Sequence, residues 1–263
     1  MTAATISRAS TQAPSTVGVR ARGITKSFHV DGSKLPVLNG VSLEVESGEM
    51  VSVMGPSGSG KSTLLYCLAG LEHPDEGTVE VHGQEIARLS RADLAKMRRT
   101  DVGFVFQAYN LIPTLSAFDN VALPHMLAGD RPDRAVIERT LEDVGLGHRI
   151  DARPPSMSGG EQQRVALARA LAQQPAVVFA DEPTGALDTR SGEVVLDKLK
   201  EISRAPGQCV LLVTHDPGVA AHCDRVVFMR DGELVDEIRP KDVGHVAGVL
   251  TGLTDNDTRA TRD

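Results

Sequence analysis

The chain has 263 residues, of which 41% are hydrophobic and 24% charged, a composition ordinary for a soluble globular protein with a sizeable core. The 28 lysine and arginine residues against 35 aspartate and glutamate residues leave a net charge of −7, which argues against nucleic acid as a partner. The longest apolar runs are strand-sized, too short to cross a bilayer, and the cysteines, Cys67, Cys209 and Cys223, show no CxxC spacing, as expected of a reducing compartment.

Both ends of the chain are polar. Residues 1–18 are rich in serine, threonine and alanine without an apolar core segment, so we expect a disordered tail and not a secretory signal. The polar residues 254–263 predict a second disordered tail. The folded part is therefore expected to span residues 19–253.

The first folded portion has a β character. Residues 24–53, together with GTVEVHGQEI from Gly77, resemble short β-segments separated by glycine turns. They predict an antiparallel β flank beside the main fold.

The stretch GEMVSVMGPSGSGKSTLLYCLAGL predicts a strand over 50–54, a glycine-rich loop and a helix from Lys61 that ends at a Gly70 cap. Its centre matches G-x-x-x-x-G-K-[ST], in which backbone N–H groups surround phosphates at the positive end of a helix. Lys61 is expected to reach the β- and γ-phosphates, and Ser62 to bind Mg²⁺. A ligand-free Gly-Ser turn is disfavoured because the motif lies between a strand and a helix. The expected ligand contacts are Gly55, Pro56, Ser57, Gly58, Ser59, Gly60, Lys61, Ser62 and Thr63.

A helical insert is expected over roughly residues 108–160. Helical patterns cover 111–153, and Pro113, Pro124 and Pro132 are expected to separate the helices.

The stretch SMSGGEQQRVALARAL from Ser156 places two glycines before a predicted helix but contains no lysine. Ser158 and Glu161 form a Ser-x-x-Glu capping box. Capping does not explain Gly159 and Gly160, since each glycine costs about 1 kcal/mol in a helix interior relative to alanine. We therefore expect a second anion-binding helix end, whose first-turn N–H groups the glycines leave open to a ligand.

An acidic pair follows an apolar strand in AVVFADEPTGALD. Phosphate-loop proteins hold the Mg²⁺ shell with a carboxylate at the end of a buried strand, and Asp181 has that position. Adjacent Glu182 is placed to accept a proton from an attacking water. The alternative, a solvated acidic turn, fits poorly after a wholly apolar strand.

Further strands are expected in CVLLV from Cys209 and RVVFM from Arg225, with a helix from Ser191 and an Asp-Gly hairpin in RDGELV. Strands that alternate with helices predict an α/β fold with a P-loop NTPase core and a mainly parallel sheet. The HCD triplet at 222–224 lacks a second ligand pair and does not predict a metal site.

Taken together, these motifs closely resemble those of ATP-binding cassette proteins over roughly residues 19–251. SGGEQQR resembles the family's signature motif, with Met157 where leucine is usual. The resemblance implies that two cassettes pair head to tail, and that each ATP lies between the phosphate loop of one subunit and the signature residues of the other, Ser158, Gly159, Gly160 and Glu161. The second anion-binding helix end would then serve the partner's nucleotide.

The resemblance implies roles for four further residues. Gln107, in GFVFQAYN, matches the Q-loop glutamine near Mg²⁺ and the attacking water. Asp188, in GALD, matches the D-loop at the dimer interface, and His215, in LLVTHD, matches the switch histidine that contacts the γ-phosphate. Phe28, in ITKSF, stands where the family usually has an aromatic residue that stacks on adenine, although packing in the core is an open alternative.

The same stretches most resemble the macrolide-export and lipoprotein-release branch of the family. That likeness implies an ATPase using ATP and Mg²⁺, paired with a second copy of itself. It would work at the cytoplasmic face of the membrane with a separate permease that exports or extracts lipophilic or peptide cargo.

Two alternatives remain. One is a cassette ATPase that acts on DNA, ribosomes or iron–sulfur assembly. The other is a nucleotide-binding module without turnover, against which Glu182 and His215 argue.

Overall fold

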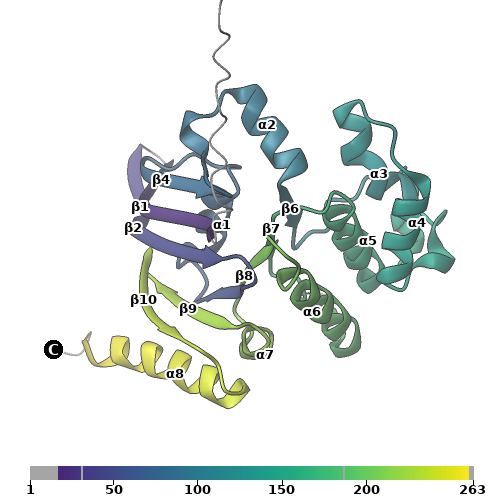
Figure 1. Cartoon of the computed structure of the whole chain (residues 1–263). Helices are drawn as coiled ribbons and strands as arrows, with labels where there is room; N and C mark the ends of the chain where they lie inside the picture. The colour runs from purple at the N-terminus through teal and green to yellow at the C-terminus, as the bar shows by residue number, and fades with distance from the viewer. Residues whose placement is uncertain (1–16, 31, 186, 261–263) are drawn as a thin grey trace, which may run out of the picture.

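The computed structural model describes residues 17–30, 32–185 and 187–260, with side chains described as far as residue 253. A central sheet has an antiparallel sheet on one side and a group of helices on the other (Figure 1). The expected tail at 1–18 lies outside the described residues except for Val17 and Gly18, which already belong to strand β1 (Val17–Val30) because Val17 pairs with Glu46.

The core is a six-stranded sheet in the order β10-β9-β3-β8-β7-β6. Its strands are β3 (Met50–Met54), β6 (Val102–Val105), β7 (Val177–Asp181), β8 (Cys209–Thr214), β9 (Arg225–Arg230) and β10 (Glu233–Ile238). All neighbouring pairs are parallel except β9–β10. Every residue of β3, β7 and β8 is buried, as expected of strands with both faces covered. The predicted α/β fold with a mainly parallel sheet is confirmed.

Helices cover this sheet, and none in the described part of the chain combines the length and apolar character needed to span a membrane. They are α1 (Lys61–Leu68), α2 (Arg91–Thr100), α6 (Thr189–Ser203), α7 (Pro217–Ala221) and α8 (Val243–Ala260), with a short 3₁₀ turn at Ile86–Arg88. Gly70 follows the α1 cap at a φ of 66°, as predicted.

Helix α8 passes the expected C-terminal boundary at residue 253. Its backbone continues through residues 254–260, where a disordered tail was expected, while 261–263 lie outside the described residues. Val246 is fully buried, and Val249, Leu250 and Leu253 pack against the same apolar cluster. This packing anchors the helix, and each added turn then costs little because propagation is easier than nucleation.

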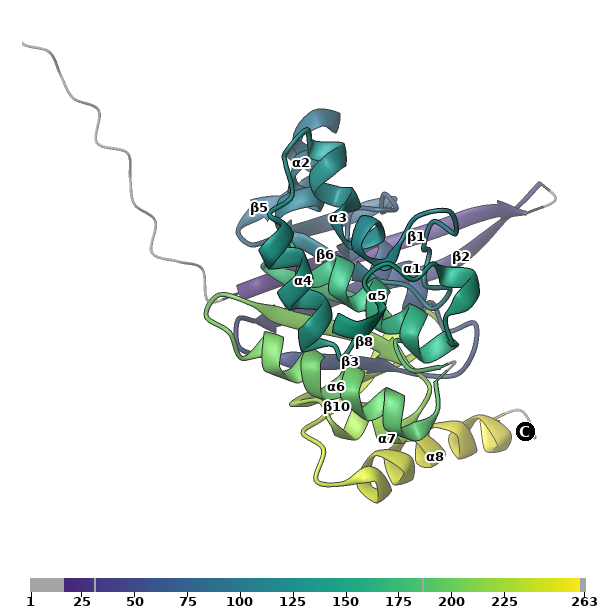
Figure 2. The same cartoon turned by 90° about the vertical axis from the view of Figure 1, so that its right-hand side faces the viewer.

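The antiparallel flank is a four-stranded sheet in the order β2-β1-β4-β5. It consists of β1, β2 (Ser33–Glu46), β4 (Glu76–Val81) and β5 (Gln84–Glu85). The prediction of short segments was wrong for β1 and β2, which form a long hairpin that projects from the molecule (Figure 2). Gly23 and Gly40 do not end strands but lie at irregularities within the β1–β2 pairing.

The expected helical insert contains α3 (Ala117–Ala128), α4 (Arg134–Asp143), two 3₁₀ turns (Gly147–Arg149 and Pro154–Ser156) and the start of α5 (Gly159–Leu171). Pro113 and Pro132 lie outside the helices as predicted, but Pro124 lies inside α3, contrary to the prediction. The start of α3 is strongly anchored, because Ser116 caps it and Asn120 hydrogen-bonds back to Ile112. These bonds offset the donor that proline lacks.

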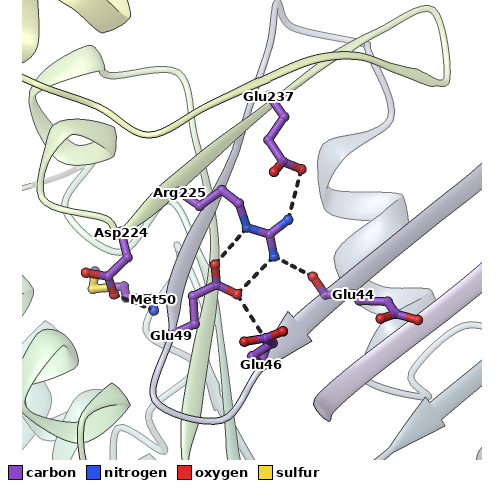
Figure 3. A network of polar contacts seen from close by, with 7 residues as sticks. All are labelled: Glu44, Glu46, Glu49, Met50, Asp224, Arg225 and Glu237. Carbon is purple, nitrogen blue, oxygen red and sulfur yellow. Dashed lines mark hydrogen bonds and ion pairs between the residues drawn. The ribbon is translucent and has the colours of Figure 1, made fainter. Parts of the chain in front are cut away.

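An arginine joins the two sheets (Figure 3). Arg225, on β9, binds both carboxylate oxygens of Glu49, just before β3, at 2.7 and 2.9 Å. The same guanidinium donates to Glu237 on β10 at 2.9 Å and to the main-chain carbonyl of Glu44 on β2. Bidentate arginine–carboxylate pairs are directional, so this contact fixes how the flank sits on the core.

Candidate functional site

The predicted phosphate loop, residues 55–63, follows β3: residues 55–60 connect the strand to α1, and residues 61–63 form the first turn of that helix. Gly60 caps α1 at a φ of 100°, a conformation that favours glycine. The first intrahelical bond runs from the Leu64 N–H to the Gly60 carbonyl at 2.8 Å, so the N–H groups of residues 61–63 lie ahead of it. These donors, at the positive end of the helix, are suited to phosphate oxygens.

The Lys61 ammonium lies within the same loop. It donates to the carbonyl oxygens of Gly55 and Pro56, each at 2.8 Å. Burial lowers the pKa of Lys61, and the charges of Glu182 and Asp181 oppose that shift. A buried cation between the loop and two carboxylates is placed to neutralise phosphate charge.

A hollow of about 360 Å³ opens beside the loop and contains Phe28. The residues that line it are Phe28, Val37, Gly58, Gly60, Lys61, Ser62 and Thr63. The Phe28 side chain, on β1, is 38% exposed, and the Lys26 ammonium lies 5.3 Å from its ring centroid. A partly exposed ring at the hollow favours contact with a ligand over packing in the core. The buried Ser59 hydroxyl has no hydrogen-bond partner in the described structure, so the loop also holds a polar atom that a ligand can satisfy.

Asp181 ends β7, where its side chain receives two hydroxyl donors. Ser62 Oγ donates to Oδ1 at 2.9 Å and the Tyr66 hydroxyl donates to Oδ2 at 2.8 Å. Burial, together with the bond to Asp181, raises the pKa of Tyr66 to about 12, so the phenol remains a donor. Carboxylate and hydroxyl oxygens are ligands that Mg²⁺ prefers, so Ser62 and Asp181 fit the expected metal.

Glu182 lies next to Asp181 in a left-handed conformation, with a φ of 47°. Its Oε2 accepts a bond from Thr214 Oγ1 at 3.1 Å, and its Oε1 lies 2.7 Å from His215 Nδ1. Both partners stand at the end of β8, and the His215 side chain is 69% exposed. Positive φ is costly for a residue with a side chain, and such strain is common at functional sites.

The Gln107 side chain lies near the loop after Glu182. A Cβ added to Gly185 would be 3.9 Å from Gln107 Nε2 and 3.6 Å from Glu182 Cβ. Because Gly185 has no side chain, it leaves room for Gln107 and Glu182, which are distant from each other in sequence, to lie close to it.

Helix α5 begins as predicted. Ser158 Oγ accepts a bond from the Glu161 N–H at 3.3 Å, and Glu161 Oε2 accepts one from the Ser158 N–H at 2.8 Å. The latter bond lowers the pKa of Glu161. The first intrahelical bond starts at Gln162, so the N–H groups of Gly159 and Gly160 lie ahead of it. None of the residues that line the hollow at the phosphate loop comes from this helix.

Gly160 also has a structural reason that sequence reasoning missed. A Cβ there would lie 2.8 Å from Ser191 Oγ on α6. Asp188 caps that helix, because its carboxylate accepts bonds from Ser191 N–H and Oγ at 3.0 and 2.7 Å, which lower the pKa of Asp188. The exposed Asp188 and the start of α5 thus meet through Ser191.

The HCD triplet at residues 222–224 shows no sign of a metal site. His222 Nδ1 lies 2.8 Å from the Gly218 carbonyl, and Asp224 accepts a bond from the Met50 N–H. Within the residues that the structure describes, no three histidine, cysteine or acidic side chains gather into a metal cluster.

Two contacts of the expected site residues were missed. Tyr66 lies four residues after Ser62 on one helix, a spacing that puts both on the same face and was available as a signal. The second missed contact is the bond from Thr214 to Glu182. A threonine at the end of a strand is common, so its presence before His215 did not predict this bond.

The Asp231–Gly232 turn was predicted, but its contact with the phosphate loop was missed. The predicted hairpin is confirmed, with φ of 48° and 80° at its two residues. Gly232 N–H donates to the Ser59 carbonyl at 3.1 Å, and the Gly232 carbonyl accepts a bond from Asn39 N–H at 2.9 Å. The turn therefore links the loop to strand β2 of the flank.

Known proteins resemble this chain in sequence and in fold. Residues 38–185 match the family model described as ABC transporter. The macrolide export ATP-binding/permease protein MacB of Wolinella succinogenes is 45% identical over 84% of this chain. The lipoprotein-releasing system ATP-binding protein LolD 2 of Caulobacter vibrioides is 45% identical over 81% of this chain and 94% of its own length.

The chain spans only 35% of the length of the MacB relative, about a third. Among solved structures, the dimeric post-hydrolysis state of the ATP-binding cassette MJ0796 bound to ADP and Pi matches with 39% identity and a TM-score of 0.79. That match covers 84% of this chain and 98% of the other.

Gly232→Ala tests the support of the loop. Alanine at positive φ costs about 1 kcal/mol, and here its Cβ would also lie 2.5 Å from the Val37 carbonyl. We expect a fall of roughly 2–3 kcal/mol in the free energy of unfolding, measured with urea, and weaker ATP binding. The matched control is Gly83→Ala, at a φ of 78° with no described atom within 4 Å of the added Cβ. Equal losses in the two variants would contradict the support role.

Proposed function

The chain belongs to the ABC transporter family, and from this membership we propose that it binds and hydrolyses ATP to power a separate membrane permease. The observation that carries the proposal is the grouping of a phosphate loop, the buried Asp181 carboxylate and a hydrogen-bonded Glu182–His215 pair at one edge of the sheet. Two carboxylates, one imidazole and one ammonium there match the needs of phosphoryl transfer to water.

Each side chain has a role that its contacts support. The N–H groups of residues 61–63 and the Lys61 ammonium bind the β- and γ-phosphates, while Ser62 and Asp181 would hold Mg²⁺ with the help of Gln107. Bound Mg²⁺ would offset the negative charge that develops on the phosphates. Glu182 takes the proton of the attacking water, since Thr214 and His215 orient both of its oxygens. His215, exposed beside Glu182, stabilises charge on the γ-phosphate.

Phe28 is the proposed platform for adenine. It lines the same hollow as the phosphate loop, and an exposed phenyl face stacks on a base without needing a hydroxyl.

A second copy of the chain completes the site. The α5 end, with Ser158, Gly159, Gly160 and Glu161, has an anion-binding geometry but contributes nothing to the lining of the hollow in its own chain. In the proposed head-to-tail dimer it binds the phosphates held by the partner, and exposed Asp188 lies at the interface. The dimeric state of the MJ0796 cassette supports this pairing.

The permease is proposed to dock in a groove beside Gln107. The groove, of about 310 Å³, lies between α2, β6, α3 and α5, and its lining includes Phe104, Phe106, Leu127 and Arg169. Phe106 adjoins Gln107, so a permease seated there would be one residue from the catalytic site. The chain would work at the cytoplasmic face of the membrane, and the likeness to macrolide-export and lipoprotein-releasing proteins supports lipophilic or peptide cargo.

Glu182→Gln tests hydrolysis. Glutamine keeps the size of the side chain but cannot accept the proton, so we expect the steady-state ATPase rate to fall at least about 100-fold. ATP affinity should stay within about twofold of the wild-type value, because the phosphate contacts remain. For the same reason, the variant should elute as a dimer on size exclusion in the presence of ATP. Rapid turnover by Glu182→Gln would remove Glu182 from the role of base.

Ser158→Arg tests the shared site. The long side chain blocks the start of α5, so ATPase activity should fall to background while the affinity of the monomer for ATP is unchanged. Ser90→Arg is the control, because Ser90 caps α2 in the same way, and losing either cap costs about 1 kcal/mol. Normal ATPase rates in Ser158→Arg would contradict the shared-site model.

Leu127→Asp tests the docking groove. This side chain is 72% exposed, so the change should leave folding and basal ATPase activity intact but put a charge where an apolar partner surface is expected. In cells that also carry the permease, we expect the variant to move from the membrane pellet to the supernatant, measured by immunoblot. Val243→Asp, a change at a half-exposed position on α8, should stay in the pellet. Retention of Leu127→Asp in the pellet would place the permease elsewhere.

A further inference from the structure

The carboxylate of Asp181 is held from two sides by one helix. Ser62 and Tyr66 are four residues apart on α1, and their hydroxyls bind different oxygens of Asp181, at 2.9 and 2.8 Å. The Asp181 side chain is 5% exposed, so water contributes little to fixing it. The Ser62 hydroxyl is also an expected ligand of Mg²⁺. The Tyr66 hydroxyl has no expected role in binding the metal, so it can remain a hydrogen-bond donor to Asp181.

The tyrosine ring packs against an aromatic side chain, Phe104, which has aromatic neighbours of its own. Its centroid lies 5.8 Å from that of Phe104, which stacks on Phe106 at 4.1 Å and lies 6.4 Å from Phe179. The contact with Phe104 restricts the rotation of the half-buried Tyr66 ring, which limits where its hydroxyl can lie.

We infer that Tyr66 is a positioning residue that fixes the Asp181 carboxylate for the Mg²⁺ bound with ATP; this inference rests on the proposed function. Mg²⁺ demands near-octahedral geometry and tolerates misplaced ligands poorly. Removing a hydrogen-bonding partner of a metal-binding carboxylate typically lowers metal affinity about 10- to 100-fold. Removal of the Tyr66 hydroxyl should therefore weaken the contribution of Mg²⁺ to nucleotide binding.

Tyr66→Phe isolates the hydroxyl, because phenylalanine keeps the ring and its contact with Phe104. The dissociation constant of a fluorescent, non-hydrolysable ATP analogue is measured on the purified chain in EDTA and in saturating Mg²⁺. The ratio of the two constants gives the gain in affinity from Mg²⁺. In Tyr66→Phe we expect this gain to shrink about tenfold, with the affinity in EDTA unchanged.

Tyr109→Phe is the matched control, since it removes the same hydroxyl from the only other tyrosine in the chain, and its Mg²⁺ gain should equal that of the wild type. Loss of affinity in both conditions by the same factor would indicate a purely structural role for Tyr66 and overturn the inference, as would an unchanged gain. Failure of the wild type to bind the analogue in either condition would instead overturn the proposed function. Thermal unfolding of each variant confirms that it is folded.

Discussion

Three parallel strands, β3, β8 and β7, lie side by side in the core sheet, and the rest of the site depends on this alignment. Met54, the last residue of β3, pairs with Thr214, the last of β8, while Asp181 pairs with Val213. The chain leaves all three strands at one edge within about 10 Å, since neighbouring strands are about 4.8 Å apart. A phosphate loop, an acidic pair and a histidine, distant in sequence, therefore face one small volume.

Of the two helix starts predicted to bind anions, that of α1 lies at the hollow beside the phosphate loop, and that of α5 does not. The start of α1 shares that hollow with Phe28, whereas the start of α5 contacts α6 through Gly160 and Ser191. Packing against Ser191 gives Gly160 a structural reason, but capping alone does not explain the adjacent Gly159. In the proposed dimer, this helix end forms one half of a binding site, and the second molecule supplies the other half.

Sequence reasoning succeeded where the chemistry is local. The loop at 55–63, the capping box at Ser158 and the acidic pair at the end of β7 each occupy one short stretch, so their spacing predicts their geometry. It failed where distant segments meet: Tyr66 bonds to Asp181, 115 positions away. The spacing from Ser62 puts both hydroxyls on one helix face, but it does not identify the distant carboxylate as the partner of Tyr66. Glycines that looked like turns proved to be irregularities within β1 and β2, because strand pairing overrides local preference. The site roles themselves remain predictions.

The arginine contact between the sheets has a consequence for which ligands fit. Phe28 belongs to the antiparallel sheet and the phosphate loop to the parallel one, and Arg225 holds the two at a fixed separation through Glu49 and the Glu44 carbonyl (Figure 3). In the proposed site, this contact fixes the distance between the ring that would stack on the base and the loop that would bind the triphosphate. A phenyl face stacks on any purine or pyrimidine, because every base has a π-face. Such a protein would select nucleotides by the distance between base and phosphates and would discriminate only weakly between bases.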